Sequence, residues 1–425
     1  MSNSPLNIRN NPAVCWVTAQ VVVFTDMSAR EFTHCTPDSP LGQGDSSMYD
    51  LVLKQARVID PQAGLDKVCD LAFKDGNVAI IRDTIPASEA LESHDLTGRL
   101  VVPGLIDLHT HVYWGGAAIG IEPDAYAKAS GLSTLIDAGT AGPGNFTGFL
   151  KHVIEPADTR ILAFLNISFP GIFAFSREIM VGECGDLRLL NPAACLNIAS
   201  RYPDDIVGIK VRVGMTASDG QGPAPLDLAL EVADELGLPV MCHLDNPPPS
   251  RLEVVSRLRK GDILTHCFRP FPNAPARMRD GAVREEIIAA RERGVIFDIG
   301  HGGGSFGFVT AEAMISAGFL PDCISSDVHV LSIDGSAQSQ LNTLSKFLAL
   351  GVSLNDVIAA STSGPAAAIG RPELGSLVPG SPGDATVLHL DEGSFEFTDV
   401  EGLIRTGNTR LAGDARVLGG RWHSA

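Results

Sequence analysis

Eight short apolar segments in the middle of the chain alternate with segments of helical periodicity. The intervening segments include PLDLALEVADELG and AVREEIIAARERG, in which apolar residues recur every three or four positions, as on one face of a helix. Eight strand–helix repeats are the number found in a closed parallel barrel. We therefore predict an α/β fold with a TIM-type (β/α)8 barrel over residues 101–370. The candidate strands are residues 101–109, 133–139, 160–167, 206–213, 238–244, 262–267, 295–300 and 323–328.

The two flanks of this region have a different pattern, with short alternating strands and turn residues. Residues 49–100 include an Asp75–Gly76 turn, and residues 371–425 contain segments such as DATVLHLD and RLAGDARVLGG. Two β-rich flanks predict a small β-sandwich domain assembled from both sides of the barrel. Residues 1–48 fit neither pattern. This extension is either a poorly ordered tail or a stretch upstream of a true start codon at Met48.

The charge and composition exclude several classes of partner. The 425 residues carry a formal net charge of −18, which disfavours nucleic acids and anionic membrane surfaces. We find no stretch of eighteen apolar residues and no convincing signal-peptide cleavage site, so we expect neither a membrane span nor secretion. The eight cysteines form no CxxC pair, which favours a reducing compartment. We expect a cytoplasmic homo-oligomer that acts on a small molecule.

Two histidines lie one residue apart at the end of the apolar stretch LVVPGLIDLHTHV. In a strand, residues i and i+2 point to the same face, so His109 and His111 should project together. Two buried core histidines with ordinary hydrogen bonds are the alternative. A converging pair on so apolar a strand favours metal binding, because neutral imidazoles are common metal ligands.

Polar residues at the ends of four later apolar strands could complete such a site. They are Lys210, His243, His266 and Asp327. A lysine in the β-branched run IVGIKVRVG has no obvious route to water, so burial should lower its pKa and favour the neutral amine. A lysine that reaches solvent or pairs with an acid is the alternative.

The order HxH, Lys, His, His, Asp resembles the binuclear-metal branch of the amidohydrolase superfamily. The resemblance extends from about residue 49 to the end. It implies two divalent metals, with zinc the expected ion. It also implies that His109, His111 and Asp327 hold the more buried metal, that His243 and His266 hold the more exposed one, and that carbamylated Lys210 bridges both. The runs GHGGGSFGF and SGLSTLIDAGTAGPGNFTGF resemble a deacetylase-like, dihydroorotase-like group within this superfamily.

The resemblance also implies a mechanism. Two adjacent metals lower the pKa of a shared water, and the resulting bridging hydroxide attacks the carbonyl carbon of the substrate. Asp327 then has two roles, as a metal ligand and as the base that passes a proton to the leaving group.

Five further residues are candidates for substrate binding. Arg212 shares strand parity with Lys210 and could bind a carboxylate, although a structural ion pair is equally compatible with the sequence. His301 and His329 follow the last two candidate strands. Tyr113 has the parity of the histidine pair, and simple packing is its alternative role. Gly303 lies in a glycine run that could form an anion-binding nest or let the backbone pass close to the metal site.

These residues favour a metal-dependent hydrolase that cleaves an amide or ester of a small carboxylate-bearing substrate. A dihydroorotase-like hydrolase of cyclic amides is the nearest alternative. Dihydroorotases, however, typically carry arginine two residues after the second histidine, where this chain has Tyr113. Nucleobase deaminases generally use one metal without the lysine. A non-catalytic barrel scaffold is the alternative from another class, but such scaffolds lose metal ligands.

Overall fold

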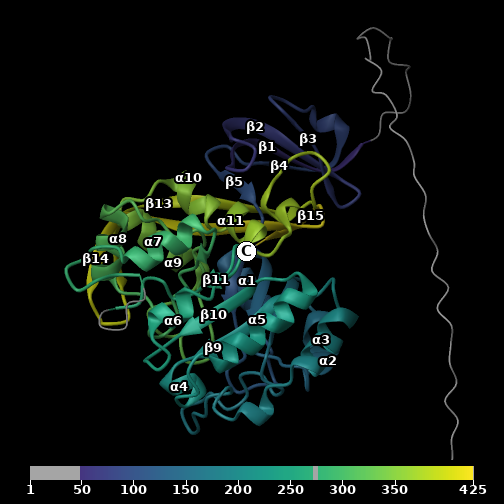
Figure 1. Ribbon diagram of the computed structural model, residues 1–425. Coiled ribbons are helices and arrows are strands. Elements are labelled where there is room, and N and C mark those ends of the chain that lie inside the picture. The colour runs from purple at the N-terminus through teal and green to yellow at the C-terminus, as the bar shows by residue number, and fades with distance from the viewer. Residues whose placement is uncertain (1–47, 271–275, 425) are drawn as a thin grey trace, which may run out of the picture. The chain divides into compact units, whose positions relative to one another are not determined.

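A parallel sheet contains the strands from the middle of the chain, which lie side by side in sequence order (Figure 1). The computed structural model describes residues 48–270 and 276–424. Neighbouring strands in this sheet are all parallel, so their carboxyl ends lie at one edge. The strands are β6 (Leu105–Thr110), β7 (Leu132–Ala138), β8 (Arg160–Asn166), β9 (Ile206–Val213), β10 (Val240–Leu244), β11 (Ile263–Leu264) and β12 (Ile296–Phe297).

Residues 323–328, the eighth predicted strand, close the ring through isolated bridges rather than as a regular strand. Asp298 follows β12 and forms a parallel bridge with Cys323, while Val328 forms one with Thr110 of β6. The segment therefore lies between the last and the first strand of the sheet. The prediction of an eight-membered parallel barrel is confirmed.

Four of the strands are shorter than the sequence predicted, and β8 differs least, since it ends at Asn166 rather than at residue 167. Strands β11 and β12 have two residues each, against the predicted ranges 262–267 and 295–300, and β10 begins at Val240 rather than at residue 238. The chain leaves the extended conformation soon after β11 and β12, since His266 has φ +65° and Gly300 has φ +45°. Apolar patterning cannot reveal this change, because the residues on both sides of it are buried.

Helices follow the strands. The helix predicted in PLDLALEVADELG is α5 (Ala224–Leu236), which ends at Gly237 in a left-handed conformation. The helix predicted in AVREEIIAARERG is α7 (Glu285–Glu292). The remaining helices are α1 (Pro123–Ser130), α2 (Phe146–Phe149), α3 (Pro192–Arg201), α4 (Met215–Ser218), α6 (Arg251–Val255), α8 (Phe308–Ser316), α9 (Gln340–Ala349), α10 (Leu354–Ala359) and α11 (Ser363–Ala368), with short helical turns at η1 (Ala87–Glu89), η2 (Leu150–Ile154), η3 (Leu187–Leu189) and η4 (Pro372–Gly375).

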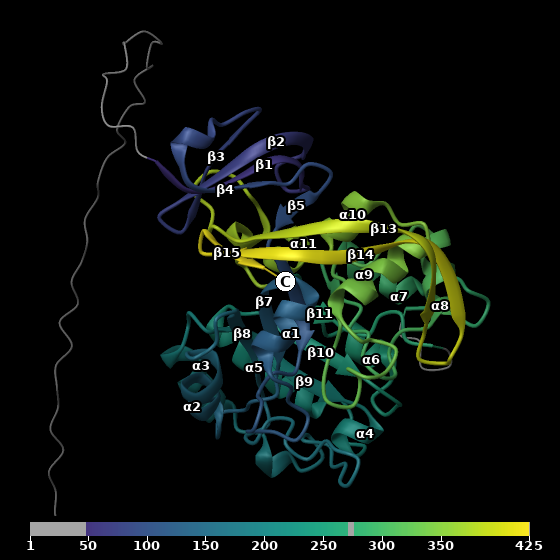
Figure 2. The same ribbon diagram turned by 180° about the vertical axis from the view of Figure 1, so that it is seen from behind.

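The two flanks of the barrel contribute strands to a second sheet (Figure 2). Its order is β15-β14-β13-β5-β1-β2-β3, with β4 paired to β1. Apolar side chains from both flanks, such as Val58, Phe73, Val387 and Val417, form one buried cluster. The strands are β1 (Tyr49–Asp60), β2 (Leu65–Lys74), β3 (Asn77–Arg82), β4 (Ala90–Asp95), β5 (Leu100–Pro103), β13 (Ala385–Thr398), β14 (Ile404–Leu418) and β15 (Arg421–Ser424).

The first predicted barrel strand, residues 101–109, is divided at Gly104 between the two sheets. Strand β5 pairs with β1 and β13 in the second sheet, and β6 begins the barrel one residue later. The backbone N–H of Gly104 donates to the carbonyl of Asp384 (3.0 Å), and a Cβ at this position would lie 2.2 Å from Oγ of Ser133. Glycine is required here because two segments approach the backbone closely.

The predicted N-terminal extension, residues 1–48, lies outside the described residues except for Met48. Within the residues that the structure describes, no helix is long and apolar enough to cross a membrane.

Candidate active site

All six predicted metal ligands line one cavity of about 390 Å³ at the carboxyl edge of the barrel. His109 lies near the end of β6, and His111 follows that strand directly. Lys210 lies in β9 and His243 in β10, while the other two lie just beyond regular strand structure. The complete set is His109, His111, Lys210, His243, His266 and Asp327.

The ligand atoms of these residues lie close together. Oδ1 of Asp327 is 3.2 Å from Nε2 of His111 and 3.4 Å from Nε2 of His109. Nζ of Lys210 is 3.4 Å from the same Nε2 of His109. Ligand atoms of His109, His266 and Asp327 all lie within 4.8 Å of one another, a spacing that suits one metal ion. This trio combines members of the two ligand groups that the family resemblance implies.

Hydrogen bonds at Nδ1 orient three of the four imidazoles, so that Nε2 is left for a ligand. A metal-binding histidine commonly has its other ring nitrogen fixed in this way. The pairs are His109 with Oγ1 of Thr265 (2.9 Å), His111 with Oγ1 of Thr140 (2.8 Å) and His266 with the carbonyl of Gly300 (2.7 Å).

Buried carboxylates accept hydrogen bonds from the two threonines that contact His109 and His111. Thr265 donates through Oγ1 to Asp298 (2.7 Å), which also accepts a hydrogen bond from Ser325 (2.6 Å). Burial raises the pKa of Asp298 to about 7. Asp137 accepts a hydrogen bond from the backbone N–H of Thr140 (2.7 Å). Neither aspartate was predicted from the sequence, although each lies at or just beyond the end of an apolar strand, where the predicted ligands also lie.

Burial keeps the predicted histidine ligands uncharged. It lowers the pKa values of His109, His243 and His266 well below the usual range, and that of His111 to about 3. Burial also lowers the pKa of Lys210 to about 8. Metals bind neutral imidazole, and carbon dioxide reacts with a neutral amine.

Two predicted ligands have an unfavourable backbone conformation, and a third has a buried nitrogen without a hydrogen-bond partner among the described residues. His266 and Asp327 have left-handed backbones, with φ of +65° and +46°, which is uncommon outside glycine and costs energy. Nε2 of His243 is buried and has no hydrogen-bond partner within residues 48–270 and 276–424. A buried nitrogen without a partner is costly unless it binds something else, so the donor set fits a metal ion.

Close backbone approach explains part of the glycine run at residues 300–304. A Cβ on Gly302 would lie 2.2 Å from Oδ2 of Asp327, and one on Gly300 would lie 2.7 Å from Nδ1 of His266. Gly303 and Gly304 line the cavity, where a Cβ would meet little or nothing. Gly300 and Gly302 are therefore required because a side chain would clash with the site residues. At Gly303 and Gly304 the absence of a side chain leaves the cavity wider.

Three of the five candidate substrate-binding residues line the cavity: Arg212, Gly303 and His329. Arg212 donates through Nη1 to Oε2 of Glu183 (3.2 Å), and its guanidinium lies 5.0 Å from the centre of the Phe175 ring. The ion pair that the sequence left open for Arg212 is therefore present.

Tyr113 and His301 do not line the cavity. The hydroxyl of Tyr113 donates to the carbonyl of Asn145 (3.3 Å), while His301 contacts Nζ of Lys346 (2.6 Å) and stacks on Phe306. Their positions do not support substrate contact. Tyr113 lies beyond the end of β6, where strand parity no longer applies, and its contacts match the packed role that the sequence left open.

Several residues of the cavity wall were not predicted. Arg269 lies three positions after His266, in the sequence HCFR, and that spacing from a ligand was the available signal. Ser305 ends the segment from Gly302 in which the sequence suggested an anion-binding nest, but no role was predicted for its side chain. The rest of the wall is apolar and comes from loops without strand periodicity, namely Ile119, Ile172, Phe175, Met180 and Leu331.

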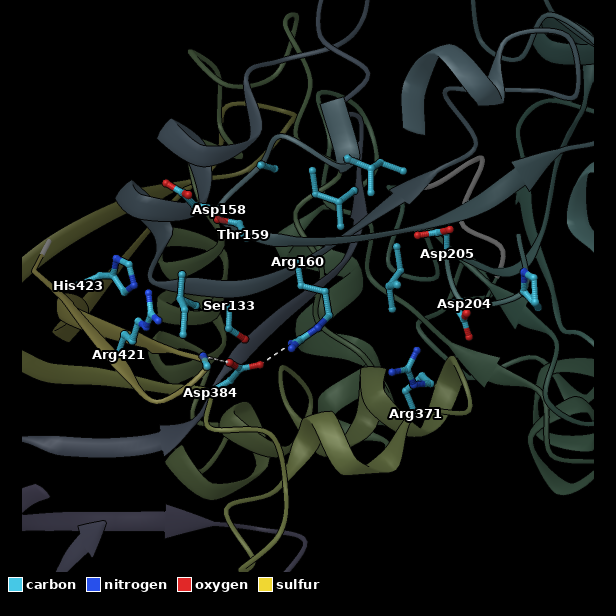
Figure 3. A pocket seen from close by; sticks show the side chains of 17 residues that line it. Ser133, Asp158, Thr159, Arg160, Asp204, Asp205, Arg371, Asp384, Arg421 and His423 are labelled. Atoms are coloured by element: carbon cyan, nitrogen blue, oxygen red, sulfur yellow. Dashed lines mark hydrogen bonds and ion pairs between the residues drawn. The ribbon is translucent and has the colours of Figure 1, made fainter. Parts of the chain in front are cut away.

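A larger cavity of about 990 Å³ lies at the opposite, amino ends of β7 and β8 (Figure 3). Figure 3 shows Arg160, the first residue of β8, pointing toward Asp384, with which it forms an ion pair. Arg371, another lining residue, is paired with Glu373 (2.6 Å). None of the predicted ligands lines this cavity, and barrel enzymes carry their chemistry at the carboxyl edge.

The closed barrel with histidine, lysine and aspartate at its carboxyl edge is that of a metal-dependent hydrolase. No protein-family model matches the chain. A deacetylase of Brucella anthropi is 36% identical over 353 residues, covering 82% of this chain and 86% of the relative. A solved adenine deaminase has a TM-score of 0.81 and 28% identity, over 89% of this chain and all of its own. A solved dihydroorotase has a TM-score of 0.79 and 32% identity, over 88% of this chain and 97% of its own. The chain therefore belongs to the deacetylase-like, dihydroorotase-like group of the amidohydrolase superfamily.

Proposed function

We propose that the protein removes an acyl group from a small substrate that carries a carboxylate, by hydrolysis of an amide or ester bond. Two divalent metals, with zinc as the proposed ion, would be held by His109, His111, Lys210, His243, His266 and Asp327. When bound, the metals would polarise the scissile carbonyl group and lower the pKa of water. The observation that carries the proposal is the convergence of all six side chains on one buried cavity.

Lys210 has the setting that carbamate formation needs. Its side chain is buried, and the lowered pKa of about 8 leaves about a tenth of the amine neutral at pH 7, far more than in an exposed lysine. The neutral amine adds to the carbon of carbon dioxide and loses one proton, which gives a carbamate with two oxygen ligands. Its neighbours His109 and Met241 lie 3.4 Å from Nζ, so the group would form within the ligand cluster.

We propose that Asp327 moves the proton of the reaction. Burial raises the pKa of its carboxyl group, which makes it a better base than an exposed aspartate. One carboxylate oxygen faces His109 and His111, and Asp327 also lines the cavity. It would accept a proton from the attacking water and return it to the departing amine or alcohol.

The deacetylase relative supports an acyl group as the part removed. Hydrolysis of a cyclic amide is the second candidate, because a solved dihydroorotase is 32% identical to this chain. The position of Tyr113 argues against dihydroorotate, since the residue that replaces the expected arginine lies outside the cavity wall.

A substrate screen with metal analysis tests the proposal. The purified protein should contain about two divalent ions per chain, and a chelator should abolish hydrolysis, which added zinc restores. The screen would cover N-acyl amino acids and acyl hydroxy acids in both enantiomers, with dihydroorotate as the competing substrate. Efficient turnover of dihydroorotate would favour the second candidate. Full occupancy by metal without turnover of any substrate would favour a scaffold.

A further inference from the structure

Three cationic side chains line the cavity, and only two of them could bind a substrate carboxylate. They are Lys210, Arg212 and Arg269. Lys210 lies within the ligand cluster. The recognition of an anionic substrate therefore depends on which arginine has an uncompensated charge.

The charge of Arg212 is already compensated. Its guanidinium and the Glu183 carboxylate form a buried pair, with side chains only 9% and 2% exposed. If Arg212 turned toward a substrate, it would leave the Glu183 carboxylate buried without its partner, which is strongly unfavourable. The face of Phe175 against the guanidinium holds Arg212 further in place.

Arg269 lacks such a partner. Its Nη1 donates to the carbonyl of Leu244 and its Nη2 donates to Oγ of Ser305 (3.0 Å), both of which are uncharged. No carboxylate within the described residues forms an ion pair with Arg269, and the adjoining segment FPNAP contains none. Burial lowers the pKa of Arg269 to about 10, so the guanidinium remains positive at neutral pH. Asp245 and Asp327 attract this half-buried guanidinium from nearby, but neither forms an ion pair with it within the described residues, so the two neutral acceptors alone fix its orientation.

Ser305 provides a second donor beside this cation. Its hydroxyl oxygen accepts the hydrogen bond from Arg269, and its own proton has no acceptor among the residues that the structure describes. Ser305 lines the cavity together with Gly303 and Gly304, which leave space above the loop. A guanidinium beside a free hydroxyl suits the two oxygens of a carboxylate.

We propose that the substrate carboxylate binds Arg269 and Ser305, and that Arg212 instead maintains the structure of the cavity wall. The inference rests on the proposed deacylase function. Phe175, Met180 and Leu331 then face the remainder of the substrate, which favours an apolar group next to the carboxylate.

Matched variants distinguish the two arginines. Arg269→Gln and Arg212→Gln each remove one positive charge but keep a side-chain donor. The substrates are the N-acetyl derivatives of leucine, methionine and phenylalanine, each compared with its primary amide. The readout is the ratio of kcat/KM for acid over amide, together with metal content and melting temperature for every variant.

We expect Arg269→Gln to lower the acid-over-amide ratio by about 10- to 100-fold, mainly through KM, because a hydrogen bond to a charged group is lost. Arg269→Lys should recover part of the ratio, and Ser305→Ala should lower it less than Arg269→Gln does. Arg212→Gln should instead lower the melting temperature and change the ratio by less than about threefold. The inference would be overturned if the acid-over-amide ratio fell only in Arg212→Gln, or if it stayed unchanged in both variants.

Binding in an inactive background separates this inference from the proposed function. Calorimetry with metal-loaded Asp327→Asn and N-acetyl-leucine measures affinity without turnover. If the wild type hydrolyses none of the substrates, the proposed function fails. The carboxylate subsite is still supported if the double variant Asp327→Asn, Arg269→Gln binds N-acetyl-leucine more weakly than Asp327→Asn alone. Equal binding by these two proteins would overturn the inference about the subsite.

Discussion

Asp327 faces His109 and His111 through Oδ1 and also lines the cavity. Its two proposed roles, as a metal ligand and as the base, can be separated by one substitution. Asp327→Asn keeps an oxygen that can bind metal but removes the base. We expect metal content to fall modestly and kcat to fall by at least ~10². Metal analysis and steady-state kinetics on the same preparation measure both quantities. Activity near that of the wild type would mean that another residue transfers the proton, and His329 in the cavity wall is the next candidate.

Lys210 is expected to act only as its carbamate. Lys210→Ala should therefore lose most of the bound metal and nearly all activity, while a short carboxylic acid such as acetate or propionate restores part of both. The added acid would supply the two oxygens that the carbamate provides. Two bound metals and normal turnover in the variant, without added acid, would show that the bridging role is wrong.

The rate of metal uptake should depend on pH through the same lysine. The pKa of Lys210 is lowered by burial to about 8, and the amine is neutral above that value. At constant dissolved carbon dioxide, uptake of zinc by the metal-free protein should become faster between about pH 7 and pH 9 and then level off. The histidine ligands stay neutral throughout this range, so they contribute no pH dependence of their own. A rate that does not vary would contradict carbamate formation at this residue.

The convergence of the six ligands was predictable, because each lies at or near the end of a buried apolar strand and parallel strands share one edge. Arg269 was not predictable in the same way. It follows β11 by several residues, and its orientation depends on the Leu244 carbonyl and Ser305, which come from other segments. Sequence spacing carries no information about which arginine has a carboxylate partner, so the sequence favoured Arg212.

At the scale of elements, the loop after β12 passes so close to Asp327 that only glycine fits at position 302. Gly302→Ala would place a Cβ against Asp327 in a backbone with φ +51°. We expect lower metal content, a decrease in kcat of at least about tenfold and a loss of stability of about 1–2 kcal/mol. Gly222→Ala is the control, since Gly222 has φ +61° with no atom within 4 Å of the added Cβ. It should lose stability but keep metal and activity. Equal effects of both variants on kcat would mean that backbone strain alone is responsible.

Element boundaries were the least predictable part of the fold. Apolar periodicity correctly located the barrel strands, and the Asp75–Gly76 turn has the positive φ at both residues that the sequence suggested. The division of the first strand at Gly104 was not visible, because every residue of β5 and β6 is buried and both strands begin with apolar residues. Only the approach of Asp384 and Ser133, from segments far away in the sequence, determines where one sheet ends and the other begins.

At the scale of the whole molecule, we propose that residues 49–100 and 371–425 act as one domain beside the barrel of residues 101–370, and that the first 47 residues are dispensable. A chain that begins at Met48 should fold, bind metal and turn over substrate like the full chain, because β1 starts at Tyr49. Thermal unfolding, metal analysis and kinetics of both forms test this. A large drop in melting temperature would show that the extension contributes to the fold. Sedimentation of the two forms also tests the expected homo-oligomer.

The position of β5 makes the predicted metal site dependent on β13, a strand that is synthesised long after the histidine pair. Strand β5 pairs with β1, which precedes it closely, and with β13, which is synthesised much later. The histidine pair follows from β5 through Gly104, so we expect its final placement to await the C-terminal strands. Nascent chains arrested before Ala385 should bind zinc weakly, whereas chains released after β15 should bind it tightly. Delayed assembly would keep unfinished chains from sequestering metal in a partly formed barrel.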